Sequence, residues 1–167
     1  SFNVLAQANW PNGQTVRIIV PFPGGASTLD SVVRTLTPDI SKSLGSPVIV
    51  DNKPGAGTVI GVDATAKATD NLTVGAVANS FTVNQSLIKT LPYSTTKDLQ
   101  PVVLMARTAN VLAVKASLPV NNLKELIEYA KKNPGKLSYA SFGNGTTAHF
   151  AGEMLKSMAG IFAVHIP

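Results

Sequence analysis

The chain has 167 residues, of which 44% are hydrophobic and 14% are charged. This length suits one ordinary domain or two very small ones, and the apolar content excludes wholesale disorder. The net charge of +5 is scattered along the chain, and aromatic residues make up only 6% of it. A nucleic-acid surface needs a basic stripe with stacking aromatics, so we expect no nucleic-acid partner and consider small anions instead.

Several kinds of site are excluded by what the sequence lacks. It contains no cysteine, which rules out disulfide scaffolds, thiolate metal sites and thiol nucleophiles. No histidine or carboxylate spacing indicates a metal site, and no nucleotide-binding motif has its proper spacing, so we expect no metal and no cofactor. No window approaches 18 continuous apolar residues, so we expect a chain that does not span a membrane.

Residues 1–9 are expected to be a tail or the remnant of a signal peptide. Ala-Gln-Ala at 6–8 has the small-x-small form of a signal-peptidase site. The export interpretation predicts a periplasmic protein that is secreted through a cleaved signal peptide, and the alternative is a disordered tail.

Short β-branched runs alternate with amphipathic segments along the chain. The runs predict strands at 16–20, 47–50, 72–77, 102–106, 111–114, 137–140 and 161–165. Helical spacing of apolar residues predicts helices at 27–40, 57–67, 84–89, 122–132 and 146–158. Pro38 should kink the first helix or restart it with Thr37 as the cap. The alternation predicts an α/β fold with a mostly parallel sheet and helices on both faces.

Ligands of such sheets bind beyond the carboxyl ends of the strands, so the loops 21–30, 78–84 and 141–147 are the candidate sites. The first loop, here called loop one, contains Gly24 and Gly25, which allow close backbone approach. The following helix start offers N–H groups with partial positive charge, which is typical of a carboxylate or phosphate cradle without Lys or Arg. The alternative is a capped turn in which Ser27 or Thr28 is only the N-cap.

The loop at 141–147, here called loop three, repeats this pattern of a strand, a Gly-rich turn and a helix start with hydroxyls. Two such helix starts favour the hypothesis that both face one ligand, whereas the alternative is an Asn-Gly turn with a threonine cap. The loop at 78–84, here called loop two, offers the hydroxyls of Ser80 and Thr82, and a polar turn is its alternative.

His149 keeps a different class of function possible, namely an enzyme. His149 and Glu153 stand four residues apart on a predicted helix, where a surface pair is the simpler interpretation. The sequence shows neither the nucleophile nor the acid that would complete a catalytic triad with His149. The alternative function is therefore a small α/β hydrolase-like or transferase-like enzyme that uses His149 as its base.

Four stretches, taken in order, carry a resemblance to a known family. They are Val-Arg-Ile-Ile-Val-Pro-Phe-Pro-Gly-Gly at 16–25, Pro-Val-Ile-Val-Asp-Asn-Lys-Pro-Gly-Ala-Gly at 47–57, Leu-Pro-Tyr at 91–93 and Asn-Pro-Gly-Lys-Leu-Ser-Tyr-Ala-Ser-Phe-Gly-Asn-Gly-Thr-Thr-Ala-His-Phe-Ala-Gly-Glu at 133–153. From about Trp10 to Pro167 the chain resembles the Bug family, the tripartite tricarboxylate transporter receptors related to TctC.

The resemblance implies a type II periplasmic-binding-protein-like fold with mostly parallel sheets and flanking helices. It implies a first α/β domain at 10–103 and an incomplete second domain at 104–167, with the first crossing between them at 102–106. It also implies a solute-binding receptor, not an enzyme, which captures a small carboxylate and passes it to membrane transporter subunits.

The resemblance also implies which residues contact the ligand. By motif position these are Phe22, Pro23, Gly24, Gly25, Ala26, Ser27, Thr28, Asp30, Ser80, Phe81, Thr82, Gly143, Asn144, Gly145, Thr146 and Thr147. The family's first loop usually has one residue fewer before its Asp, and this departure leaves open whether Asp30 reaches the ligand.

Overall fold

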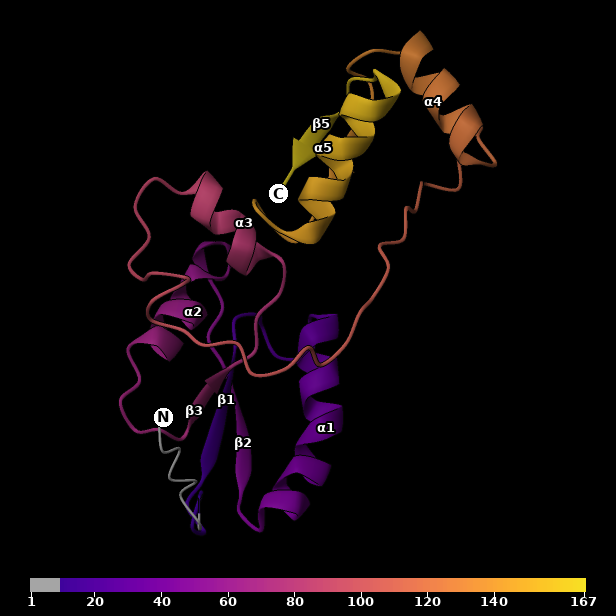
Figure 1. The fold of residues 1–167 in the computed structure, drawn as a ribbon. Helices are drawn as coiled ribbons and strands as arrows, with labels where there is room; N and C mark the ends of the chain where they lie inside the picture. Colours follow the sequence, from indigo (N-terminus) through magenta and orange to yellow (C-terminus); the bar gives the residue numbers. More distant parts are fainter. Residues whose placement is uncertain (1–9) are drawn as a thin grey trace, which may run out of the picture. The chain divides into compact units, whose positions relative to one another are not determined.

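The computed structural model describes residues 10–167, which form two compact units that divide between Ala106 and Arg107 (Figure 1). The predicted signal-peptide remnant at 1–9 lies outside the described residues. No described helix combines the length and the apolar character needed to cross a membrane.

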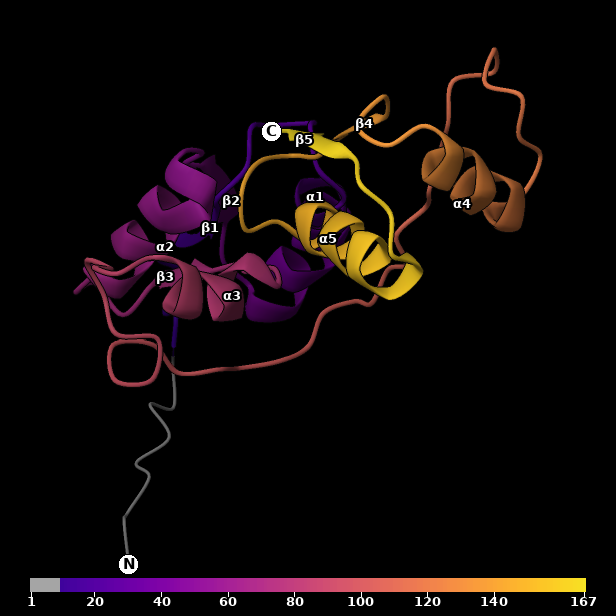
Figure 2. The same cartoon turned by 90° about the horizontal axis from the view of Figure 1, so that it is seen from above.

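The first unit is built on a parallel sheet with strand order β2-β1-β3. Its elements are β1 (Val16–Val20), α1 (Thr28–Leu44), β2 (Val48–Asn52), the short 3₁₀ helix η1 (Ala56–Thr58), α2 (Val59–Ala66), β3 (Thr73–Gly75) and α3 (Ser80–Leu87). Figures 1 and 2 show α1 on one side of the three strands and α2 on the other. The predicted parallel sheet with helices on both faces is confirmed in this unit.

The core of the first unit is centred on β1, because the middle strand of a covered parallel sheet is buried on both faces. Ile18 and Val20 of β1 pack with Val33 of α1 and with Ala76, which follows β3. Val20 is fully buried and Val33 is 1% exposed. This packing fixes the carboxyl end of β1, where loop one begins.

The second unit contains one parallel strand pair, β4 (Ser138–Ala140) with β5 (Val164–Ile166), and the helices α4 (Leu123–Lys132) and α5 (Thr147–Ala159). Asn122 caps α4 by accepting a hydrogen bond from the main-chain N–H of Glu125. Gly152 of α5 lies against the ring of Tyr139 in β4, which brings this helix close to the strand pair.

The predicted strands at 102–106 and 111–114 are wrong. Residues 101–115 have no regular secondary structure, and Val102, Val103 and Val111 are 75–88% exposed. A strand needs a neighbour to complete its hydrogen-bond ladder, and within residues 10–167 no strand pairs with this segment. β-branched composition therefore indicated only a local preference for extended backbone.

Two predictions about helices also need correction. Pro38 does not restart α1 with Thr37 as the cap, since one helix runs from Thr28 to Leu44. Thr37 lies inside it, and its hydroxyl donates to the Val33 carbonyl at 2.7 Å. The helix predicted at 84–89 begins earlier, at Ser80. Its N-cap, Asn79, makes no side-chain capping bond, so the usual start signal is absent there.

Close packing of α2 against the loops yields a first prediction about stability. A Cβ at Gly61 would lie 2.7 Å from Pro21 Cβ and 2.8 Å from the Lys53 carbonyl oxygen. Because both neighbours are fixed, we expect Gly61→Ala to lower the free energy of unfolding by about 1–3 kcal/mol. Urea unfolding measures this, with Ile60→Ala on the exposed side of α2 as the control. Equal effects of the two substitutions would contradict the prediction.

Candidate functional site

Loop one connects β1 to α1 and ends in a capped helix start. Ser27 is the N-cap, with its Oγ accepting from the Asp30 N–H at 3.1 Å. Gly25 has a φ of +72°, which glycine adopts without strain. Ser27 thus has the capping role that the alternative predicts, while Thr28 stands at the first helical position with an exposed side chain.

A buried carboxylate holds loop one in shape. Asp30 is fully buried, and its Oδ2 accepts from the Gly25 N–H at 2.8 Å and from Arg34 Nε at 2.9 Å. Its Oδ1 accepts from Asn52 Nδ2 at 2.7 Å, and the same amide group donates to the Phe22 carbonyl at 2.9 Å. Asp30 and the Gly25 amide are thus committed to each other inside the loop.

The first main-chain amides of α1, at the end of loop one, have no hydrogen-bond acceptor among the described residues. No described residue accepts a hydrogen bond from the N–H of Thr28 or of Leu29. These are the first two orphan donors of a helix start, and they carry the positive end of the helix dipole. They suit an anion better than the Gly25 amide does, because they need not break an internal bond.

The hydrogen bonds to Asp30 predict how acid affects stability. The Asn52 amide, the Gly25 amide and Arg34 lower the pKa of Asp30 from 3.8 to about 2 against the opposing effect of burial. A depressed folded-state pKa stabilises the protein above the unfolded-state pKa, and this contribution is lost as the pH falls. We expect a loss of roughly 2 kcal/mol between pH 5 and pH 2.

Urea unfolding of the wild type and of Asp30→Asn across this pH range measures the effect. The variant should show the shallower pH dependence, since it lacks the titrating group. Identical slopes for the two proteins would contradict the assignment.

Loop two is more internal than its sequence indicates, because its residues form the first turn of α3. Ser80 is 1% exposed, and its hydroxyl accepts from the Thr58 hydroxyl at 3.0 Å. Phe81 stacks on Tyr93 with ring centroids 6.5 Å apart. Thr82 is exposed, but its hydroxyl donates to the Asn79 carbonyl at 2.9 Å. Ser80 and Phe81 therefore have structural contacts in this unit.

Loop three connects β4 to α5. Its hydrogen bonds resemble those of loop one, but a different side chain accepts from the glycine amide. Thr146 is the N-cap of α5, and its hydroxyl donates to the Gly143 carbonyl at 2.7 Å. The Gly145 N–H donates to His149 Nδ1 at 3.1 Å, in the same way that the Gly25 N–H donates to Asp30 in loop one.

In loop three, too, the main-chain amides that are available to a ligand belong to the first turn of the helix. Within the described residues, nothing accepts from the N–H of Thr147 or of Ala148. The hydroxyl of Thr147 stands beside them, and Asn144 is exposed in the preceding turn. The two loops thus offer the same chemistry, a pair of helix-start amides with a threonine hydroxyl.

Sequence reasoning missed the side chains that support these loops. Asn52 and Arg34 hold loop one, while His165 contacts loop three, with its Nε2 2.7 Å from Ser141 Oγ. Asn52 lies inside the second family-like stretch, which was the one available signal. Ser141 and His165 resemble a nucleophile and its base, yet no described carboxylate bonds to the other nitrogen of His165.

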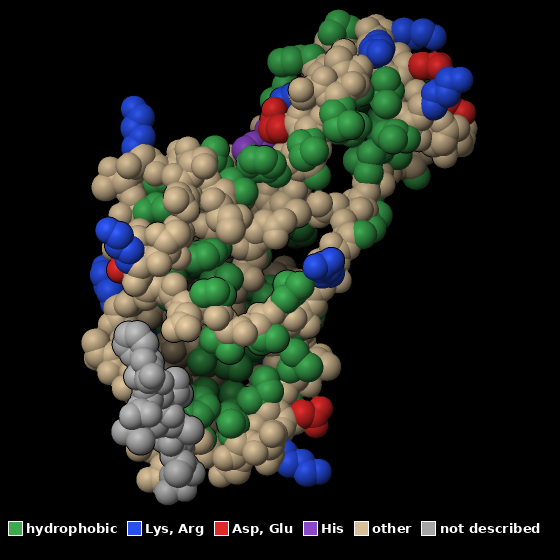
Figure 3. Space-filling model, viewed as in Figure 1, with side chains coloured by type: hydrophobic (Ala, Val, Ile, Leu, Met, Phe, Trp, Pro, Cys, Tyr) green, Lys and Arg blue, Asp and Glu red, His purple; other side chains and the backbone are tan. Residues whose placement is uncertain are grey.

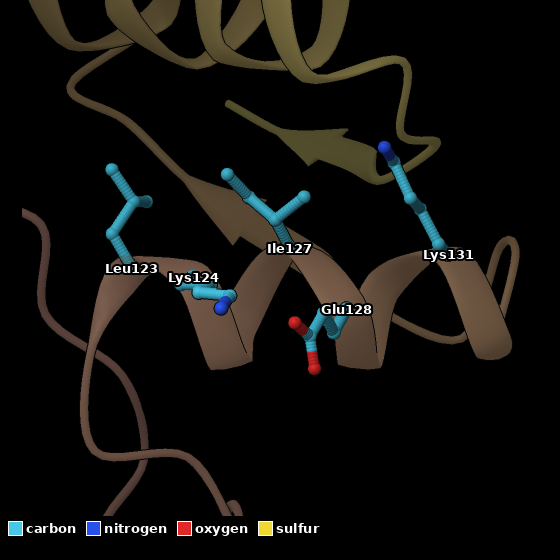
Figure 4. Close-up of a pocket in the computed structure, with 5 residues that line it drawn as sticks. All are labelled: Leu123, Lys124, Ile127, Glu128 and Lys131. Atoms are coloured by element: carbon cyan, nitrogen blue, oxygen red, sulfur yellow. The ribbon is translucent and has the colours of Figure 1, made fainter.

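One hollow in the second unit is not formed by these loops. It has a volume of about 540 Å³ and is lined along one helix, α4, as Figure 4 shows. Its lining residues are Leu123, Lys124, Ile127, Glu128 and Lys131. On the face in Figure 3, Lys and Arg side chains at the upper right are interspersed with Asp and Glu side chains. The described residues also contain no group of three metal-ligating side chains.

A family model, the tripartite tricarboxylate transporter family receptor (TctC), matches residues 32–167. A UPF0065 protein of Bordetella pertussis is 41% identical over 165 residues, which cover 97% of this chain and 50% of the relative. The chain thus spans about half the length of the curated relatives it matches.

Two solved structures carry bound carboxylates. Rpa4515 of R. palustris with adipate is 31% identical with a TM-score of 0.88, and the match covers 95% of this chain and 53% of that one. MatC (Rpa3494) of Rhodopseudomonas palustris with bound malate is 27% identical with a TM-score of 0.75, at coverages of 92% and 53%. A third structure, the periplasmic binding protein BugD, is 34% identical with a TM-score of 0.78, at coverages of 92% and 52%. These neighbours confirm the predicted periplasmic-binding-protein-like fold.

The family model describes receptors for solutes, and its match covers well over half of the chain. The resemblance inferred from the ordered motifs is therefore confirmed. The chain belongs to the TctC family of tripartite tricarboxylate transporter receptors.

Proposed function

We propose that the protein is a periplasmic solute-binding receptor, which captures a small carboxylate and delivers it to membrane subunits of a tripartite tricarboxylate-type transporter. One observation carries the proposal. The helix starts of α1 and α5 each keep two main-chain amides free of described acceptors, while neighbouring side chains fix the loops that lead into them.

The chemistry of these helix starts favours carboxylates. A carboxylate oxygen accepts hydrogen bonds from main-chain N–H groups, and the helix dipole adds favourable electrostatic energy. Hydrogen bonds to a charged acceptor contribute about 1.5–3 kcal/mol each. Thr28 and Thr147 add hydroxyl donors beside these amides. No Lys or Arg side chain is required for such a site.

Two further facts support the proposal. The related structures with adipate and with malate show that proteins of this fold hold small carboxylates. A periplasmic location agrees with the sequence of residues 6–8 and with the description of the related BugD structure as a periplasmic binding protein. From the sequence-predicted ligand set we retain as contacts Thr28, Thr147, Asn144 and Thr82, which present exposed or half-buried side chains.

The proposal is tested with the full-length protein by calorimetry and thermal unfolding. Adipate and malate should bind and raise the Tm, whereas the uncharged analogue 1,6-hexanediol should do neither. Equal Tm shifts with the diol, or no binding of any mono- or dicarboxylate, would contradict the proposal.

The Ser141–His165 contact keeps a hydrolase-like enzyme as the second candidate, since the two polar atoms lie 2.7 Å apart. Hydrolysis of a simple ester such as p-nitrophenyl acetate decides between the two functions. We expect no turnover above that of Ser141→Ala. Turnover that disappears in Ser141→Ala would favour the enzyme.

A further inference from the structure

Two histidines from different elements of the second unit are stacked on each other. His149 lies in α5 and His165 in β5, and their ring centroids are 4.2 Å apart with an interplanar angle of 16°. Tyr139 of β4 also stacks on His165, at a centroid distance of 4.8 Å. The cluster thus joins both strands of the unit to the helix that begins at loop three.

Each histidine is connected to a glycine of loop three. His149 Nδ1 accepts directly from the Gly145 N–H at 3.1 Å. His165 Nε2 contacts Ser141 Oγ at 2.7 Å, and this hydroxyl oxygen accepts from the Gly143 N–H at 3.1 Å. The shape of the loop therefore depends on an unprotonated Nδ1 in His149 and on the hydrogen bond of His165.

Loop one shows why the choice of acceptor matters. There, the Gly25 N–H donates to Asp30, whose pKa of about 2 keeps it an acceptor throughout the physiological range. In loop three, the equivalent acceptor is an imidazole nitrogen, which becomes a donor when the ring is protonated. Two donors then face each other at Gly145, and the hydrogen bond is lost.

We propose that His149 and His165 are positioning residues for loop three, which hold its two glycines when neutral, and that His149 releases Gly145 when its Nδ1 takes up a proton. Loop one has no such group and keeps its shape over the same pH range. The two anion-binding helix starts of this receptor therefore respond differently to mild acid.

The charged and titratable groups around the pair set how it titrates. Burial, His149 and Lys156 lower the pKa of His165, and Glu153 opposes them. Glu153 accepts from the Tyr139 hydroxyl at 2.6 Å and from Lys156 Nζ at 2.8 Å, so it is already satisfied. The centroids of the two rings lie 4.2 Å apart, and two positive charges at this distance repel each other.

The direct test follows the Gly145 amide by NMR in the full-length protein between pH 8 and pH 5. In the wild type, its chemical shift should titrate together with the ring signals of the histidine pair. In His149→Asn, the side-chain oxygen stands at the place of Nδ1 and does not titrate, so the Gly145 shift should stay flat. The Gly25 amide is the internal control and should not move in either protein.

His149→Ala extends the same test, since it removes the acceptor altogether. Its Gly145 amide should differ from that of the wild type at every pH. A Gly145 titration of the same midpoint and amplitude in the wild type and in His149→Asn would overturn the proposal, and so would a wild-type amide that does not move.

The consequence for ligand binding rests on the proposed function. Loss of one hydrogen bond in the loop should weaken the binding of adipate to the wild type about fivefold more between pH 8 and pH 6 than to His149→Asn. This comparison cancels the titration of adipate itself. If adipate and malate do not bind at any pH, the proposed function fails, while the Gly145 amide still decides the role of the histidines.

Discussion

Asp30→Ala is expected to lower the free energy of unfolding by about 3 kcal/mol at pH 7, because it removes a fully buried carboxylate that organises loop one. The Gly25 N–H, Asn52 and Arg34 would all lose the acceptor that they now share. Arg34 is about half exposed and regains water, which keeps the effect at the lower end of the range for a buried ion pair.

Equilibrium urea unfolding at pH 7 measures this loss. Lys67→Ala is a matched control, since it removes one partner of an exposed i,i+4 ion pair with Asp63 at 2.8 Å and should cost less than about 1 kcal/mol. An effect of Asp30→Ala no larger than that of the control would mean that the carboxylate does not hold loop one together.

The elements that could be predicted from the sequence are those with strong local signals. The strand at 16–20 and the helices that start after Ser27 and Asn122 have runs or caps that can be recognised in a few residues. The strand agrees at both ends. Both helices start after the predicted cap residue because a hydrogen bond within the same few residues sets that start, whereas α1 ends at Leu44 instead of the predicted residue 40.

The parts that could not be predicted depend on contacts between distant residues. The segment at 102–114 has the composition of two strands, but the strand that would pair with it is not encoded in the segment itself. In the same way, Asn52 supports loop one from thirty residues away, at the end of another strand. The hydrogen bonds to Asp30 and His149 could not be inferred from spacing alone.

If main-chain amides at the helix starts bind the solute, removing one of them should weaken binding strongly. Thr28→Pro and Thr147→Pro each delete one main-chain N–H, and proline is well tolerated at the first position of a helix. The preceding residues have extended backbone, with φ and ψ of −142° and 150° at Ser27 and of −75° and 161° at Thr146, which suits a following proline. We therefore expect both variants to fold normally.

Each proline variant should lose about tenfold or more in affinity for the carboxylate, since a hydrogen bond to a charged group is removed. Thr28→Ala and Thr147→Ala are the matched controls, because they remove the same hydroxyls and keep the amides. The alanine variants report the contribution of the hydroxyls, and the further loss in the proline variants reports that of the main-chain donors.

The most direct test of the account is the affinity of the full-length protein for adipate or malate in these four variants, measured by calorimetry at pH 8. Proline variants that bind at least tenfold more weakly than their alanine counterparts, with the same Tm, are the predicted result. Proline and alanine variants of equal affinity would contradict the account, because the solute would then be held by groups other than the amides at the starts of α1 and α5.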